Sequence, residues 1–324
     1  QPRAQRFPEP MTTPPDLVRP RGLTRRGFLR GAAVTLVAGG AGGAWALDRF
    51  VIQHPEVANA SSRWSATTAA TTTPPAATAN AAATGSTVSV QKVVQGSGAA
   101  TVTYYVADLQ LGAGTDLRAA FASDTFGENI VADTSEIARQ NGALWAINGD
   151  YYGFRDTGIV IRNGVAFRDR GARQGLAVSR DGTLSLYDET ATNAGALVAD
   201  GVWHTLSFGP GMVAGGAVVA GIDDVEVDTN VGNHSIQGYQ PRTGLGMIDA
   251  RHLVAVVVDG RSSGYSRGVT MTEFAGIFVG LGVQVAYNLD GGGSSAMFYY
   301  DALASKPRGR GQERATSDIL YVAG

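Results

Sequence analysis

Apolar and polar positions from about residue 88 onward predict a succession of short strands. Val88–Val94 and Thr101–Leu109 alternate, are rich in β-branched and aromatic residues, and flank a Gly-Ser-Gly turn, so they predict a hairpin. Further short runs follow, separated by turns that include Asn-Gly and Asp-Gly, which is typical of an antiparallel meander. These runs cover residues 158–162, 165–168, 175–179, 183–187 and 203–208.

Longer patterns follow in the second half of the chain. The continuous apolar run His252–Val258 is typical of a strand buried on both faces. The residues after Thr270 place apolar side chains at helical spacing and end at Gly282, which predicts a helix. A second apolar run, Val283–Leu289, comes next. A strand, a crossover helix and a second strand together predict two parallel, neighbouring strands.

Both of these predicted strands end in polar loops that contain glycine. The first runs into Asp259-Gly-Arg261, and the second ends at Asp290, which is followed by three glycines and two serines. Because ligands bind at the carboxyl ends of strands in α/β sheets, we expect Asp259 and Asp290 on adjacent loops of one site. Consecutive glycines allow close approach of the backbone to an anion, although a tight turn is the alternative explanation.

An earlier segment repeats this arrangement. The apolar run Leu144–Ile147 predicts a buried strand that leads into Asn148-Gly-Asp150. The pattern Ala-x-Asn-x-Asp that ends at Asp150 recurs in Ala286–Asp290. If the match is a true internal repeat, Asn148 and Asp150 approach the same cleft as Asp290.

The predicted elements define the fold class. A capping-box-like start at Asp133–Glu136 adds a second short helix before the strand at 144–147. We therefore expect an α+β (mixed α/β) fold, with a mixed, largely buried β-sheet, a few packed helices and an antiparallel meander.

The N-terminal quarter of the chain has a different composition. Residues 24–47 combine adjacent arginines, Gly-Phe-Leu and an apolar run rich in alanine and glycine, which resembles a twin-arginine export signal or an uncleaved membrane anchor. Residues 48–87 are mainly Ala, Thr, Ser and Pro and predict a disordered linker. With residues 1–23 as an N-terminal extension, the folded domain is expected at 88–324. We expect this domain to be exported, either secreted or tethered to the membrane by the N-terminal segment.

Composition and charge exclude several kinds of binding site. The 324-residue chain has a net charge of −2, without the basic excess of nucleic-acid-binding proteins, and it has no cysteine for disulfides or thiolate metal sites. The acids of Asp223–Asp228 mostly alternate, which favours a solvated strand face over a calcium loop. No cofactor and no metal site is predicted, although a divalent cation that bridges acids to a phosphate stays open. The sequence gives no indication of the oligomeric state.

The candidate catalytic residues are acids in and near these loops. We predict Asp290 and Glu273 as an acid and base pair, with Asp259 as the alternative for either role, because glycoside cleavage commonly uses two carboxyl groups. Glu273 has a competing explanation, since it lies three residues after Thr270 and fits a capping box. Asp259-Gly also fits an ordinary turn.

The candidate substrate-binding residues surround these acids in the sequence. A guanidinium fork matches phosphate or carboxylate oxygens, so the nearby arginines indicate an anionic substrate. We assign Arg242, Arg261 and Arg314 to a phosphate, Asn148 and Asp150 to sugar hydroxyls, and Gly291, Gly292, Gly293, Ser294 and Ser295 to an anion cradle.

Four motifs in this order resemble the catalytic domain of phosphodiester glycosidases, the family of the lysosomal enzyme that removes N-acetylglucosamine from its phosphodiester link to mannose. They are Pro241-Arg-Thr-Gly-Leu-Gly, Val256-Val-Val-Asp-Gly-Arg, Met271-Thr-Glu-Phe-Ala and Asn288-Leu-Asp-Gly-Gly-Gly-Ser-Ser. Asn148-Gly-Asp-Tyr-Tyr and Glu313-Arg314 also fit, so the resemblance runs from about Ala100 to the C-terminus. Where the family often has Asn-x-Pro, this chain has Ser305-Lys-Pro307, so no substrate contact is carried over there.

The resemblance implies an exported hydrolase that cleaves a sugar 1-phosphodiester, or a related anionic glycoside, in envelope or extracellular polysaccharide. Two alternatives stay open. One is a non-catalytic module of the cell envelope that binds a glycan or an anionic polymer. The other is a hydrolase that cleaves an ordinary glycosidic bond, or a phosphodiester at phosphorus.

Overall fold

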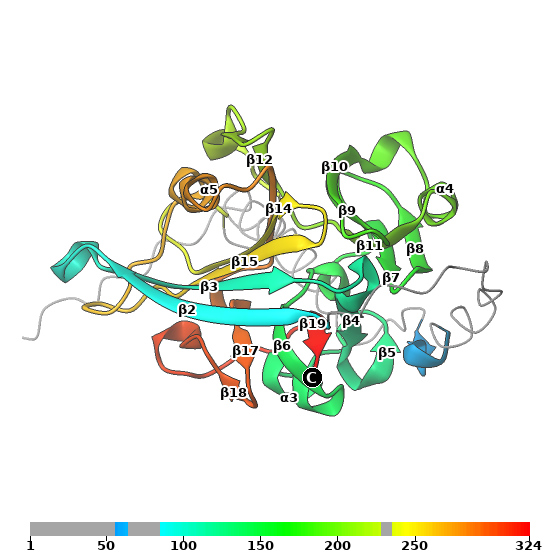
Figure 1. Ribbon diagram of the computed structural model, residues 1–324, viewed down its shortest axis with the longest axis horizontal. Helices are drawn as coiled ribbons and strands as arrows, with labels where there is room; N and C mark the ends of the chain where they lie inside the picture. The colour runs from blue at the N-terminus through cyan, green and yellow to red at the C-terminus, as the bar shows by residue number, and fades with distance from the viewer. Residues whose placement is uncertain (1–55, 64–84, 228–234) are drawn as a thin grey trace, which may run out of the picture. The chain divides into compact units, whose positions relative to one another are not determined.

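The computed structural model describes residues 56–63, 85–227 and 235–324, which belong to one compact unit that begins at Gln53. The predicted N-terminal extension and export signal lie outside the described residues. Within the described ranges, no helix is both long and apolar enough to cross a membrane. The unit consists of antiparallel sheets with a few packed helices, which confirms the predicted α+β class (Figure 1).

A seven-stranded antiparallel sheet carries most of the predicted strands. The hairpin expected from the first apolar runs forms its edge, and the apolar run at 252–258 is a strand whose side chains alternate between two buried clusters. In spatial order the strands are β13 (Ala217–Val218), β12 (Gly211–Ala214), β16 (Val285–Leu289), β14 (Arg242–Asp249), β15 (His252–Val258), β3 (Val102–Gln110) and β2 (Thr87–Gln95).

A second antiparallel sheet packs against one face of the first. Its strands in spatial order are β18 (Ala302–Leu303), β17 (Met297–Tyr299), β6 (Ala143–Asn148), β19 (Asp318–Ala323) and β4 (Arg118–Phe121). The main apolar core lies between the sheets, where Leu245 and Leu289 of the first belong to one cluster with Trp145 and Leu320 of the second. The two sheets thus bury each other's apolar faces.

A helix covers the outer face of each sheet (Figure 1). Helix α5 (Met271–Gly280) places Phe274 and Phe278 on the seven-stranded sheet, and α3 (Thr134–Gln140) places Ile137 on the five-stranded sheet. The α5 rings pack where β14 has Gly244 and Gly246, since a Cβ at these positions would lie 3.0 and 2.8 Å from ring atoms. The glycines of β14 therefore make room for the helix.

Smaller sheets complete the unit. They contain β7 (Gly158–Arg162) with β8 (Val165–Arg170), and β10 (Leu184–Asp188) with β9 (Gln174–Ser179) and β11 (Val202–Leu206), beside helix α4 (Ala194–Ala199). These elements match the predicted meander. The acidic segment does not form the expected strand, because Ile222–Asp224 is a short 3-10 helix; Asp228 lies outside the described residues.

The predicted linker contains an ordered segment. Strand β1 (Val57–Ala58) pairs with β5 (Thr125–Phe126), Ala60 is buried, and the Ser61 backbone N–H and hydroxyl donate to Asp124 at 2.8 Å each. The domain thus includes residues that composition alone assigned to the linker.

The structure corrects the prediction that the two strands leading to the site are adjacent in the sheet. β15 and β16 are parallel, but they are not neighbours, because β14 lies between them and pairs antiparallel with both. The chain between β15 and β16 therefore crosses over one intervening strand. As a result Arg242, the first residue of β14, stands at the edge of the sheet where both β15 and β16 end.

Candidate functional site

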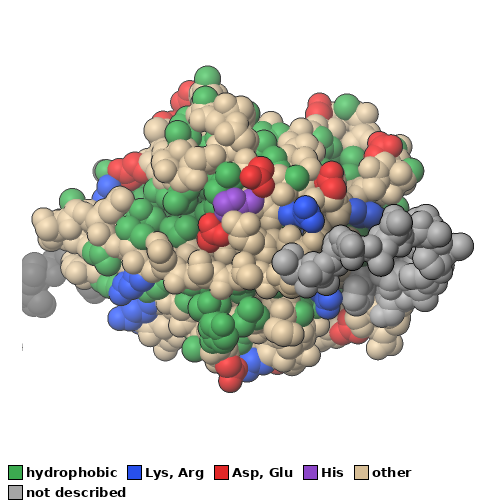
Figure 2. Space-filling model, in the orientation of Figure 1, with side chains coloured by type: hydrophobic (Ala, Val, Ile, Leu, Met, Phe, Trp, Pro, Cys, Tyr) green, Lys and Arg blue, Asp and Glu red, His purple; other side chains and the backbone are tan. Residues whose placement is uncertain are grey.

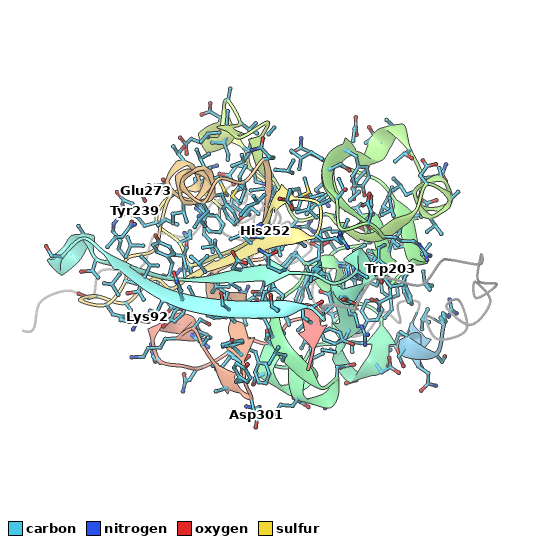
Figure 3. The ribbon with its side chains drawn as sticks, in the orientation of Figure 1. Lys92, Trp203, Tyr239, His252, Glu273 and Asp301 are labelled. Atoms are coloured by element: carbon cyan, nitrogen blue, oxygen red, sulfur yellow. The ribbon has the colours of Figure 1, made fainter. Side chains whose placement is uncertain are left out.

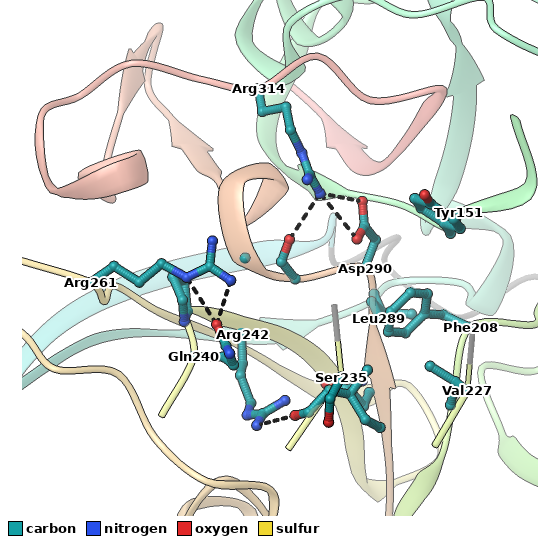
Figure 4. A pocket seen from close by; sticks show the side chains of 15 residues that line it. Tyr151, Phe208, Val227, Ser235, Gln240, Arg242, Arg261, Leu289, Asp290 and Arg314 are labelled. Carbon is teal, nitrogen blue, oxygen red and sulfur yellow. Dashed lines mark hydrogen bonds and ion pairs between the residues drawn. The ribbon is translucent and has the colours of Figure 1, made fainter. Parts of the chain in front are cut away.

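A pocket opens where β16 ends and β14 begins (Figure 4). Its described lining has three arginines on one part of the wall and aromatic and aliphatic side chains on another. The lining residues are Tyr151, Phe208, Val227, Ser235, Ile236, Gln240, Pro241, Arg242, Arg261, Asn288, Leu289, Asp290, Gly291, Gly292 and Arg314.

Asp290 follows directly after β16 and is the one carboxylate in the described lining of the pocket. It is 4% exposed, and its burial raises the pKa of the carboxyl above the ordinary value, against the opposing effect of Arg314. The Arg314 Nη2 lies 3.4 Å from both carboxylate oxygens. Burial outweighs Arg314 and Ser294, which both lower the pKa of this carboxyl, and such a balance is typical of an acid at a functional site.

The triple glycine brings the backbone close to the arginines. Gly291 and Gly292 line the pocket, and Gly292 has a φ of +61°, a conformation that favours glycine. A Cβ at Gly293 would lie 3.2 Å from the Arg314 side chain, which would have to shift slightly to admit a larger residue. Arg314 itself donates from Nε to the Ser294 hydroxyl at 3.0 Å. The glycines thus let Arg314 lie over the loop that follows Asp290.

The two serines of this motif are buried and do not line the pocket. Ser294 is 1% exposed and accepts the bond from Arg314. Ser295 is also 1% exposed, and its hydroxyl has no hydrogen-bond partner within the described part of the chain. Ser294 therefore orients an arginine of the pocket, which differs from the direct ligand contact expected of it.

Arg242 is buried, although it carries a positive charge. Its Nε donates to the Val269 carbonyl at 3.0 Å, and its Nη2 donates to the carbonyls of Ile236 at 2.7 Å and Gly238 at 3.0 Å. Burial lowers its pKa to about 10, which leaves the guanidinium charged at neutral pH. Carbonyl oxygens fix its position without neutralising it, so the charge is available to an anionic ligand.

Arg261 borders the pocket from the loop after β15. Both its Nε and its Nη2 donate to the side-chain carbonyl of Gln240, and its backbone adopts a positive φ of 56°. Burial, followed by the charge of Arg314, lowers the pKa of Arg261. Two guanidinium groups that repel each other at one pocket wall favour an anion between them.

Asn148 lies beneath the pocket, at the end of β6. Its side-chain amide donates to the backbone carbonyl of Asp290 at 2.7 Å, while its oxygen accepts from the Thr243 hydroxyl at 2.7 Å and from the Ala296 N–H at 3.2 Å. The strand ends of β6, β14 and β16 are thereby tied together. Asn148 was predicted to orient sugar hydroxyls, but the structure places it behind Asp290 and outside the pocket lining.

Asp150 also lies outside the lining, in a buried charged cluster. Its carboxylate accepts from the backbone N–H groups of Ser207 at 2.6 Å and Tyr151 at 2.8 Å, and lies 3.9 Å from Arg162. Arg162 in turn pairs with Asp318 at 2.7 Å, with both side chains at most 1% exposed. Asp150 therefore positions the backbone at Tyr151 and Ser207, beside two pocket residues.

The structure does not bring Glu273 into the pocket with Asp290. Glu273 is the capping-box partner of Thr270 at the start of α5, and its carboxylate pairs with Arg267 at 2.8 Å. The hydrogen bond from Arg267 lowers the Glu273 pKa, and Figure 3 shows the residue beside Tyr239 on the outer side of α5. Local helix capping explains this acid, and the structure does not bring the predicted pair together in one pocket.

Asp259 is likewise held in a structural role outside the lining. Its carboxylate accepts from the Tyr265 hydroxyl at 2.7 Å and from the Lys306 backbone N–H at 3.0 Å. Burial raises its pKa. The residue fixes the loops that carry Arg261 and Lys306, and the structure places this predicted alternative catalyst outside the pocket lining.

Sequence reasoning missed the aromatic part of the pocket. Tyr151 and Phe208 meet edge to face with ring centroids 5.9 Å apart, and the Arg155 guanidinium lies 5.0 and 5.4 Å from the two ring centres. Figure 4 shows both rings on one side of Asp290, away from Arg261. Phe208 follows shortly after β11 and precedes Gly209-Pro-Gly211. A strand that ends in a glycine-containing loop is therefore the sequence signal that points to this residue.

The fold and the comparison with family models show that this chain belongs to the phosphodiester glycosidase family. The family model matches residues 141–323, which include β6, β14, β16 and all three pocket arginines. This confirms the resemblance drawn from the sequence motifs.

Individual proteins share part of this sequence or its fold. The chain is 29% identical over 192 residues to the SPbeta prophage-derived uncharacterized protein YomE of Bacillus subtilis, a match that covers 56% of this chain and 27% of that protein. It thus spans about a quarter of that relative's length. The zebrafish N-acetylglucosamine-1-phosphodiester alpha-N-acetylglucosaminidase catalytic domain, auto-inhibited by its pro-peptide, has a similar fold, with a TM-score of 0.57, 18% identity and coverage of 84% and 89% of the two chains. A hypothetical protein from Synechocystis gives 0.53 at 15% identity, covering 72% of this chain and 61% of its own.

Proposed function

We propose that the chain hydrolyses a sugar 1-phosphodiester in this pocket, with Asp290 as the catalytic carboxylate. One observation carries the proposal: Asp290 lies buried between a wall of guanidinium groups and a wall of aromatic rings. The arginine wall fits a phosphate, and the aromatic wall fits the apolar face of a sugar ring. Asp290 stands where the bond between the two parts of such a substrate would lie.

The chemistry of the leaving group explains how the one carboxylate in the described lining can be enough for catalysis. A usual glycosidase expels an alkoxide and needs a second carboxyl group to protonate it. A phosphate ester anion is a far weaker base, and Arg242, Arg261 and Arg314 can stabilise its charge as it departs. Asp290 then acts in its ionised form at the anomeric carbon, either by activating water or by attacking directly.

We also propose that the domain acts outside the cytoplasm, on envelope or extracellular polysaccharide. The support is the arginine-containing, apolar segment at 24–47, which resembles an export signal. Fractionation of cells that produce the full chain, with and without Arg25→Lys and Arg26→Lys, tests this. Export that requires the two arginines supports the proposal, and equal distribution in both strains contradicts it.

The hydrolytic proposal is tested with the methyl ester of N-acetylglucosamine 1-phosphate, by following free reducing sugar. Asp290→Asn, checked for an unchanged circular dichroism spectrum, should abolish the release. In water labelled with oxygen-18 the label should enter the sugar, because cleavage occurs at the carbon–oxygen bond. Label in the phosphate would instead show attack at phosphorus, and binding without turnover would identify a non-catalytic module.

A further inference from the structure

The two lysines of this chain meet at one place on its surface. Lys92 lies on β2 and Lys306 lies in the loop after β18, and the sequence contains no other lysine. Their ammonium groups lie 5.6 and 5.1 Å from the centre of the same ring, that of Tyr265. We call Lys92 and Lys306, which share the Tyr265 ring, the lysine pair. A random surface distribution of two lysines would rarely bring them to one aromatic ring.

The lysine pair is positively charged, and neither lysine forms a direct ion pair with a carboxylate within the described part of the chain. Asp259 interacts electrostatically with both lysines, but it is 1% exposed, and its carboxylate accepts hydrogen bonds from Tyr265 and from the Lys306 backbone. Figure 2 shows Lys and Arg side chains gathered at the place where Figure 3 labels Lys92, with no acidic side chain drawn beside them. The chain as a whole carries a net charge of −2, so this surface is a local concentration of cations.

A basic segment connects the lysine pair with the pocket. Residues 306–310 read Lys-Pro-Arg-Gly-Arg, and all three cations are exposed. The segment packs on the loop after β15, since a Cβ at Gly309 would lie 2.5 Å from Ser262. The same loop runs from Arg261 at the pocket rim to Tyr265 at the lysine pair. A single loop therefore leads from the pocket to the second group of cations.

We infer that this surface binds additional phosphates of the substrate, which is then a chain of phosphodiester-linked sugars. The inference rests on the proposed function for the unit that is cleaved. A small sugar 1-phosphodiester reaches the three pocket arginines alone and leaves the buried Asp259 as the one acid that interacts with the two lysines within the described part of the chain. A chain whose phosphates recur along its length fills the pocket and reaches the lysine pair, and each contact releases counterions.

The scarcity of lysine allows a test that does not depend on activity. The full protein is treated with a reagent that acetylates lysine, in the presence of either long-chain inorganic polyphosphate or orthophosphate at the same phosphorus concentration. Mass spectrometry of the peptides then measures how far each lysine is acetylated. With polyphosphate at ten times its dissociation constant, labelling of Lys92 and Lys306 should fall about tenfold. Orthophosphate should protect little. Equal labelling under the two conditions overturns the inference.

Kinetics provide the second test, with a synthetic oligomer of sugar 1-phosphate units and its single-phosphodiester counterpart. Lys92→Gln with Lys306→Gln should raise KM for the oligomer about tenfold and leave the small substrate unchanged. The matched control, Arg139→Gln with Arg170→Gln, removes two exposed arginines elsewhere and should change neither. An unchanged oligomer KM in the lysine variant contradicts the inference. Protection of the two lysines from acetylation, without cleavage of either substrate, supports the proposed binding surface and refutes the proposed hydrolase activity.

Discussion

The side-chain amide of Asn148 donates to the backbone carbonyl of Asp290 at 2.7 Å, across 142 residues of sequence. The bond fixes the peptide that carries the candidate catalytic carboxylate, so Asn148 is a positioning residue. Asn148→Leu should lower kcat by about ten- to a hundredfold with little change in KM. Thr243→Val, which removes one neighbouring hydrogen bond of Asn148, serves as the milder control. Equal kcat values for Asn148→Leu and the wild type would exclude this role.

The pH dependence of kcat/KM should report the Asp290 carboxyl. Because the ionised form acts, activity should decline as the pH falls through the Asp290 pKa, which burial raises above its ordinary value. Arg314 opposes this rise, so Arg314→Gln should move the acidic limb to higher pH, in addition to any loss of phosphate binding. The position of the limb is the readout. A limb that moves to lower pH, or does not move, would assign it to another group.

Glu273 provides a second comparison of catalytic and structural acids. Glu273→Gln removes the charge that pairs with Arg267 at the surface, where side-chain exposures of 39% and 25% keep the contribution below about 1 kcal/mol. The variant should keep nearly full kcat, whereas Asp290→Asn should lose it. Parallel rate measurements on both variants check this, and a loss of more than tenfold in Glu273→Gln would restore it as a catalyst.

The buried Arg162 should be among the most sensitive positions for stability. Its removal in Arg162→Met leaves the carboxylates of Asp150 and Asp318 buried without their cation. Breaking such a cluster typically costs about 3–5 kcal/mol, which urea unfolding can measure. Arg170→Met, which breaks the exposed pair with Asp156, should cost less than about 1 kcal/mol. Similar losses in the two variants would refute the proposed role of burial.

His204 should make the stability depend on pH in the acidic range. Its Nε2 lies 2.8 Å from the Leu117 carbonyl, its Nδ1 accepts from the Asn163 N–H, and burial lowers its pKa to about 3. Between about pH 6.5 and 3 the unfolded chain therefore binds a proton that the folded chain excludes. Stability should fall as the pH decreases through this window, by up to about 1.4 kcal/mol per pH unit.

Urea unfolding of the wild type and of His204→Gln between pH 4 and 7.5 measures this dependence. The variant lacks the titrating group, so its stability should vary less steeply with pH, whatever its absolute value. Parallel curves for the two proteins would assign the pH dependence to other groups.

The sequence predicted individual elements better than their pairing. Local patterns predict the hairpin of β2 and β3 from its alternation, helix α3 from its capping signal and the doubly buried strand β15 from its apolar run. Strand β14 could not be predicted in this way, because Gly244 and Gly246 occupy the positions that face α5 and leave no apolar alternation. Without β14, the two strands around it were expected to be neighbours.

In the candidate site too, local sequence patterns predict some features and miss those that depend on distant contacts. The triple glycine and Asp290 were recognisable because a strand that ends in glycines and a carboxylate has few structural explanations. Glu273 was ambiguous, since a capping box and a catalytic acid give the same sequence pattern. The roles of Asn148 and Asp150 depend on hydrogen bonds to segments more than 50 residues away, which no local pattern reveals.

The position of β14 between β15 and β16 also has a consequence for folding. The β14 and β15 strands form a local hairpin, whereas β16 pairs with β14 across the intervening crossover, and Asn148 reaches Asp290 from β6. These pairings give the site a high contact order, which slows folding in small domains. The pocket should therefore be complete only when these long-range pairings have formed, so the slow formation of the sheet also limits how fast the site appears.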